Sequence, residues 1–204
     1  MKVLIVARTR MKSGLCIGGL TSDGRNVRLI APEGRHGENA PYDVGSIWEM
    51  ELHPVPFVQP PHVEDHLIVS CQLVGTARHA GRLVVSKVRP WRGGPRALFD
   101  GALRFRPSGP AYVASDCVPS GSVGFWIPDR PLTLVHTQYR DRYEYRDPGG
   151  STALFAYVGC AAPAPNIPAG SLVRVSLARW WRPPAEPDAD EVCYAQVSGW
   201  FEVT

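Results

Sequence analysis

The sequence predicts an all-β protein, and three observations lead to this fold class. Gly and Pro each occur 20 times among 204 residues, so together they occupy about a fifth of the positions. Both residue types destabilise helix interiors, Pro by about 3 kcal/mol and Gly by about 1 kcal/mol, so long helices are not expected. Ten or more short β-type segments follow one another, each closed by turn-forming residues. A stretch with Pro and Gly at 107–110 divides them into two halves.

The first half begins as an antiparallel meander. Its expected strands are 2–7, 14–20, 26–30, 46–53, 66–74 and 82–88. The second and third are joined by Thr21-Ser22-Asp23-Gly24, which is typical of a hairpin. In 46–53, Trp48 and Met50 alternate with acidic residues, which indicates one apolar face.

A short connecting helix is expected at 95–104, where Pro stands in the first turn and Leu98 and Phe99 share one side. The strands expected after it are 124–127, 132–136, 138–146, 152–160, 171–181 and 191–203. Residues 1–107 and 108–204 each have the size of a small barrel, so we predict two tandem OB-like (Greek-key) barrels. The number of strands would also suit a sandwich or one larger barrel.

Composition excludes several classes of protein. No apolar run approaches the roughly 20 residues that a membrane-spanning helix needs, and the start of the chain lacks a signal-peptide core. The five cysteines are odd in number and never occur as C-x-x-C, which argues against a disulfide framework and a zinc ribbon. We therefore expect buried, reduced thiols and a cytoplasmic location.

The charges are arranged in blocks along the chain. Residues 1–30 carry six basic and one acidic side chain, residues 31–66 carry one and seven, and residues 67–106 carry eight and one. Such blocks can place a positive stripe on one face, which would suit a polyanion, or they can neutralise one another in the fold. Of the 22 basic residues 19 are Arg, which suits bidentate phosphate contacts but also reflects a GC-rich genome.

Two basic clusters are candidate nucleic-acid contacts. Arg8, Arg10 and Lys12 alternate at the exit of the first strand, and Arg25 and Arg28 follow near the next hairpin. The alternative is a solvated loop.

The second cluster is QYRDRYEYR at 138–146, which sets tyrosines on one face and arginines on the other. The faces comprise Tyr139, Tyr143 and Tyr145, and Arg140, Arg142 and Arg146. Tyrosines in the core would leave a basic ridge, and exposed tyrosines would form a stacking platform. Asp141 and Glu144 could also neutralise the arginines.

The closing strands 171–181 and 191–203 contain the third candidate site. Alternation points Val173, Val175, Leu177, Cys193, Ala195 and Val197 into the barrel. The opposite face would carry Arg174, Trp180, Tyr194 and Trp200, a combination that single-strand binders use. Packing between two domains would require the same aromatic residues.

An enzyme is not expected. His62, Glu64 and His66 share one side of an extended segment and are the main candidates for a metal site, with a hydrolase as the resulting alternative. No H-E-x-x-H, P-loop or G-x-S-x-G motif completes a mechanism. We predict no catalytic residue, metal or cofactor.

Several segments in their order resemble the dual OB-containing domain family of bacterial proteins across nearly the whole chain. They are ARTRMKSGLCIGGL (7–20), DGRNVRLI (23–30), YDVGSIWEM (42–50), PPHVED (60–65), SVGFWIPDRPL (122–132), SLVRVSLARWW (171–181) and CYAQVSGWF (193–201). The resemblance implies tandem OB-like barrels, a role in nucleic-acid sensing or binding, and neighbouring genes that suggest antiphage defence. It implies no catalytic residues.

The sequence thus predicts a non-catalytic module that binds or senses single-stranded DNA or RNA through charge and stacking. The alternative is a protein-interaction scaffold that docks a nuclease or helicase effector. No membrane partner is expected.

Overall fold

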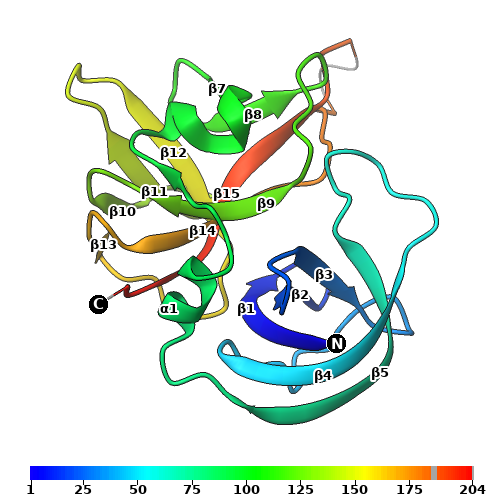
Figure 1. The fold of residues 1–204 in the computed structure, drawn as a ribbon. Helices are drawn as coiled ribbons and strands as arrows, with labels where there is room; N and C mark the ends of the chain where they lie inside the picture. Colours follow the sequence, from blue (N-terminus) through cyan, green and yellow to red (C-terminus); the bar gives the residue numbers. More distant parts are fainter. Residues whose placement is uncertain (185–187, 204) are drawn as a thin grey trace.

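The computed structural model describes residues 1–184 and 188–203 and consists of two β units that lie side by side (Figure 1). The strands of the first unit are β1 (Lys2–Arg10), β2 (Leu15–Thr21), β3 (Asn26–Ile30), β4 (Ser46–Pro54) and β5 (Asp65–Thr76). They form a closed barrel in the order β1-β2-β3-β5-β4, in which only β3 and β5 run parallel. This is the topology of a five-stranded Greek-key barrel of the OB type.

The second unit repeats this order with its first strand in two pieces. Its strands are β6 (Trp91–Arg92), β7 (Arg104–Phe105), β8 (Ala111–Ala114), β9 (Val123–Ile127), β10 (Leu132–His136), β11 (Asp141–Arg146), β12 (Thr152–Tyr157), β13 (Asn166–Ile167), β14 (Leu172–Leu177) and β15 (Val192–Phe201). Pro128 and Pro131 separate β9 from β10, and a Pro cannot donate to a ladder. β10 pairs with β11 and β9 with β14, while β12 and β15 run parallel. If β9 and β10 count as one strand, the sheet has the order of the first barrel.

The prediction of an all-β protein with two tandem OB-like units is therefore confirmed. Two predicted strands, 26–30 and 132–136, match β3 and β10 residue for residue. The predicted hairpin between β2 and β3 is also present, with Gly24 at a φ of +88° and its N–H donating to Thr21.

Both helical segments differ from the prediction. The expected strand 82–88 is wrong, because that region forms α1 (Ala80–Val85). Gly81 lies so close to the Glu202 carbonyl that a Cβ would be 2.3 Å away, and Val84 is fully buried. These distant contacts outweigh the β propensity of the Leu-Val-Val run. Residues 95–104 contain only a 3-10 segment, η1 (Pro95–Gly101), interrupted where Phe99 and Asp100 adopt positive φ.

β1 is buried on both faces and joins the two units. Val3 and Ile5 point into the first barrel, while Leu4 and Val6 belong to a separate apolar cluster between the units. That cluster also contains Leu20, Val84, Phe125 and Leu172, which come from β2, α1, β9 and β14. The units therefore share a hydrophobic interface.

The core of the second unit includes residues on both sides of position 107. Leu98 and Phe99 are buried in it together with Trp126 and Phe155, and β6 pairs with β9. The cysteines are all free, but two predicted to be buried, Cys71 and Cys117, are exposed. Among the described residues, no helix is long and apolar enough to cross a membrane.

Phe125→Ala should lower the free energy of unfolding by about 3–5 kcal/mol, because it removes a ring that is 2% exposed between the two units. Urea unfolding measures the change. Phe57→Ala is the matched control: its ring is 95% exposed, so we expect a change within about 0.5 kcal/mol. Equal effects of the two substitutions would contradict the assigned interface.

Candidate nucleic-acid interface

Four of the predicted residues meet in a groove where β1 leaves the first barrel. Arg8, Arg10 and Lys12 line this β1-exit groove together with Trp200, and its volume is about 830 Å³. Arg10 donates to the carbonyls of Gly159 and Cys160 at 3.0 and 2.9 Å, which fixes β1 to the loop after β12. Arg8 is paired with Asp43 at 3.1 Å. Sequence positions about 150 residues apart thus form one surface.

Arg25 does not join this groove, so its predicted place in the same site is wrong. The register of β1 and β2 pairs Val3 with Thr21 and Arg10 with Leu15, so the hairpin with Arg25 lies at the other end of β1. There Arg25 pairs with Asp23 at 2.8 Å.

Arg140 and Arg142 form part of a second groove of about 470 Å³. The predicted alternatives for 138–146 are settled by burial: Tyr143 and Tyr145 lie in the core, where burial raises the pKa of each to about 12. Tyr139 precedes β11 and is 83% exposed.

The acidic neighbours do not neutralise this pair of arginines. Asp141 contacts His136 and Glu144 contacts Arg146, and within the described part of the chain Arg140 and Arg142 have no acidic partner. Burial and the like charge of Arg140 lower the pKa of Arg142.

Aromatic side chains line the same groove, which we name the aromatic groove. Trp180, Trp181 and Tyr194 contribute to its walls, and the ring centroids of Trp181 and Tyr194 are 6.0 Å apart. Tyr194 also contacts Tyr112, whose ring lies 4.6 Å from the Arg106 guanidinium. Trp180 is half-buried and donates its indole N–H to the Pro60 carbonyl at 2.7 Å. Trp181 is 45% exposed, so it presents more ring surface than the predicted Trp180.

The single outer face predicted for Arg174, Trp180, Tyr194 and Trp200 is wrong. A bulge pairs Arg174 with Gly199 but Val175 with Val197, which leaves Ser198 as an extra residue. An extra residue reverses the alternation, so Trp200 packs against the second core and lines the β1-exit groove instead. Arg174 is only 4% exposed because the first barrel covers it. The predicted inward set, including Val173, Val175 and Ala195, is confirmed.

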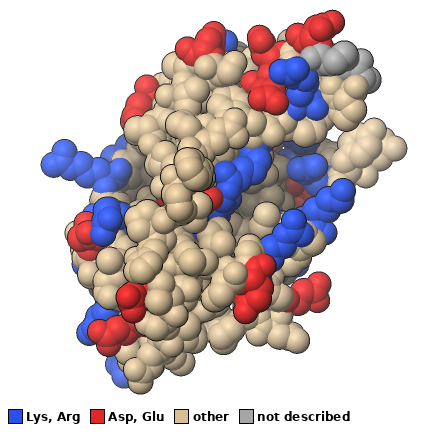
Figure 2. Space-filling view, turned by 90° about the vertical axis from the view of Figure 1, so that its right-hand side faces the viewer, with Lys and Arg blue, Asp and Glu red and all other residues tan. Residues whose placement is uncertain are grey.

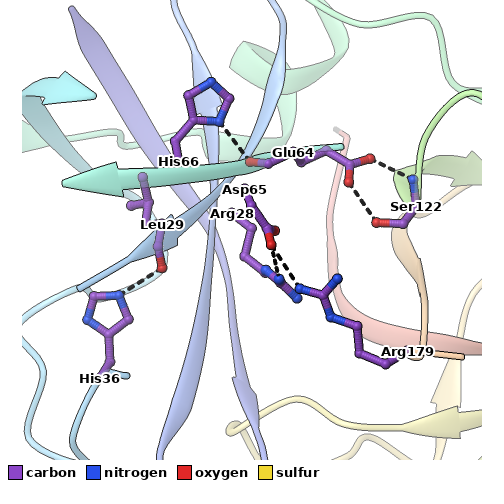
Figure 3. Close-up of polar contacts among 8 residues, drawn as sticks. All are labelled: Arg28, Leu29, His36, Glu64, Asp65, His66, Ser122 and Arg179. Carbon is purple, nitrogen blue, oxygen red and sulfur yellow. Dashed lines mark hydrogen bonds and ion pairs between the residues drawn. The ribbon is translucent and has the colours of Figure 1, made fainter. Parts of the chain in front are cut away.

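Between the two grooves lies a narrower inter-barrel cleft of about 240 Å³. Its basic side chains are Arg10, Lys12, Arg28, Arg174 and Arg179, and its acidic one is Glu64. Asp65 accepts from both Arg28 and Arg179, which ties the first barrel to the second (Figure 3). Glu64 accepts from the N–H and hydroxyl of Ser122, at 2.6 and 2.7 Å.

The metal cluster considered for His62, Glu64 and His66 does not form. The Glu64 carboxylate is held by Ser122, and the His66 ring contacts the Glu64 carbonyl at 2.9 Å (Figure 3). His62 is buried, with its Nε2 3.8 Å from the Cys193 sulfur. Across residues 1–184 and 188–203, no three His, Cys, Asp or Glu side chains are placed to hold one ion.

The two grooves and the cleft form one continuous surface. The cleft shares Arg10 and Lys12 with the β1-exit groove, and it shares Arg179 and Gln196 with the aromatic groove. Figure 2 shows basic side chains within a hollow of the molecular surface. Arg179 and Trp181 were not predicted, although the sequence ARWWR at 178–182 places two Trp beside two Arg.

The fold and this surface define a protein of two tandem OB barrels with a basic, partly aromatic groove along their junction. The chain belongs to the dual OB-containing domain family, whose model matches residues 1–200. No curated protein is similar to it in sequence. One solved structure, of a murine DNA-binding protein bound to double-stranded DNA, matches with 12% identity and a TM-score of 0.32 over 98% of this chain and 95% of that chain. A likeness this weak adds nothing to the assignment.

We expect stability to fall as the pH decreases from about 6.5 to about 4, partly because of His62. Burial, and then the charge of Arg28, lower the pKa of His62 from 6.5 to about 4. In that interval the unfolded chain binds the proton and the folded chain does not, so acid favours unfolding. Urea unfolding at several pH values should show a shallower decline for His62→Gln. His53→Gln, at an exposed ring, should follow the wild type; a parallel His62→Gln curve would refute the assignment.

Proposed function

We propose that the protein is a non-catalytic module that binds single-stranded DNA or RNA along the surface formed by the two grooves and the cleft. The observation that carries this proposal is the continuity of that surface, which combines exposed aromatic rings with basic side chains that have no acidic partner in the described part of the chain. Membership of a dual OB family supports it, because OB barrels commonly bind oligonucleotides.

The charges favour a polyanion. Arg140 and Arg142 line the aromatic groove without an acidic partner among the described residues. Lys12 lines both the β1-exit groove and the inter-barrel cleft, and it too has no acidic partner among the described residues. A phosphate backbone that contacts such groups releases counterions and gives salt-dependent affinity.

The aromatic rings favour a single strand. Trp181 and Tyr194 are partly exposed and tilted against each other by 52°. Unpaired bases can stack on such rings, with about 1–3 kcal/mol per base, whereas bases within a duplex are already stacked on one another. The surface therefore combines the two contacts that sequence-independent single-strand binders use.

Binding should weaken steeply as salt rises from about 50 to about 200 mM, because counterions compete for the same basic groups. The double variant Arg140→Gln/Arg142→Gln should bind more weakly and with a salt slope smaller by about 2. Fluorescence anisotropy with labelled single-stranded DNA and RNA measures both, with a duplex as the comparison.

Arg25→Gln/Arg104→Gln is the control for this pair, since it removes two exposed arginines that lie outside both grooves and the cleft. If both double variants lost the same affinity for single-stranded DNA or RNA, binding would depend only on the net charge of the protein and not on the aromatic groove. A wild-type protein that binds neither DNA nor RNA at low salt would contradict the proposal.

Trp181→Ala should weaken single-strand binding by about 5- to 150-fold, the equivalent of one stacked base. The same substitution should leave the salt slope unchanged, because no charge is lost. A change in slope without a change in low-salt affinity would contradict the stacking role. Tyr139→Ala is the control, because that ring is exposed in the turn before β11 and outside the groove.

A second candidate function is that of a protein-interaction scaffold that docks an effector protein, such as a nuclease or helicase. β5 supports it: β3 pairs with β5 only over Asp65–Leu67, and no other described strand continues along that edge. Val69, Leu73 and Val74 are exposed on β5. An unpaired apolar edge can accept an extended strand from a partner.

A further inference from the structure

Arg174 is a buried charge that makes no direct ion pair with any described residue. It is 4% exposed, and its hydrogen bond within the described residues runs from Nη1 to the Ser198 hydroxyl at 2.9 Å. Within residues 1–184 and 188–203, no carboxylate lies within ion-pairing distance of the guanidinium, and its Nε has no acceptor. A buried guanidinium normally has an anionic partner, because desolvating an unpaired charge is costly.

Basic side chains outnumber acidic ones around Arg174, although the Glu64 carboxylate partly offsets the charge of the guanidinium. The inter-barrel cleft contains four further basic side chains against one acidic side chain, Glu64, which Ser122 already holds. Arg28 also has a buried Nε without an acceptor, although its terminal nitrogen contacts Asp65. The cleft thus has two buried N–H donors that an anion could satisfy.

Gly18 leaves the space that the Arg174 guanidinium occupies. A Cβ at position 18 would lie 2.5 Å from Nη2 of Arg174 and 2.9 Å from its Cζ. The absent side chain on β2 therefore leaves the space that the guanidinium of Arg174 on β14 occupies against the first barrel. Both units contribute to the position of this charge.

We infer that the inter-barrel cleft is a phosphate-binding site in which Arg174 and Arg28 hold the phosphate oxygens. Guanidinium groups match phosphate in planar, bidentate fashion, and several can share one phosphate. Among the described residues no Phe, Tyr or Trp lines the cleft, and the His62 imidazole there is buried, so the cleft offers no exposed ring on which a base could stack. Its volume of about 240 Å³ accommodates a phosphate group with part of a sugar, and both ends open into the adjoining grooves.

The phosphate can belong to a nucleic-acid strand or to a free nucleotide. The first source rests on the proposed function, since the strand would cross the cleft on its way between the grooves. The second source does not depend on it. Inorganic phosphate, AMP and adenosine separate the recognition of phosphate from that of the rest of the nucleotide.

Thermal unfolding of the full chain at low salt tests the site. Phosphate and AMP should raise the melting temperature with increasing concentration, as ligands of the folded state do, and adenosine should not. Arg174→Met and Gly18→Ala should each weaken the apparent affinity for phosphate at least 10-fold. Arg104→Gln and Gly75→Ala are the controls, because Arg104 is exposed outside the cleft and a Cβ at Gly75 meets no atom within 4 Å.

The phosphate-free stability of Arg174→Met distinguishes a ligand site from a structural role. Removal of a desolvated charge that has no direct ion pair among the described residues should leave the melting temperature unchanged or raise it, while the phosphate response is lost. If Arg174→Met fails to fold, Gly18→Ala carries the test, because it displaces the guanidinium without removing it.

A phosphate response that is absent in the wild type, or unchanged in both variants, overturns the site. Normal oligonucleotide binding with no phosphate response would leave the proposed function standing without this site. A phosphate response without oligonucleotide binding would support the site and assign it to a free nucleotide.

Discussion

The whole arrangement depends on the burial of β1 from both sides. Its Val3 and Ile5 complete the first core, and its Leu4 and Val6 face β9 and β14 of the second unit and α1, which follows β5 in the chain. A strand exposed on one face would alternate polar and apolar residues, but Val3–Ala7 is apolar throughout. The same five residues therefore stabilise one barrel and position the other.

This shared strand explains why the candidate surface lies where it does. As β1 leaves the interface it carries Arg8 and Arg10 to the edge of the junction, where Arg10 donates to two carbonyls of the second unit. At the start of β5, Glu64 and Asp65 bind residues of the second unit from the opposite side. Polar contacts between the two units thus lie on both sides of the cleft, and the apolar contacts of β1 hold the units together.

Alternation along regular strands predicted the cores well. Val175 and Leu177, or Cys193 and Ala195, face inward as predicted because nothing interrupts the pleat between them. Prediction of the surface failed where regularity ends: β14 stops at Leu177, so alternation places neither Trp180 nor Trp181, and the bulge at Ser198 reverses Trp200. The burial of Arg174 and the helical form of residues 80–85 depend on contacts with distant segments, which the local sequence does not contain.

The double role of β1 also limits how the two halves can exist. A fragment that ended before β6 would keep α1 but lose Phe125 and Leu172, so part of the apolar surface formed by Leu4, Val6 and Leu20 would be exposed to water. Such an apolar stripe promotes aggregation. The two barrels therefore depend on each other for stability, unlike barrels that fold separately. If recombination replaced one barrel with an unrelated one, the contact surface of the other would also have to change.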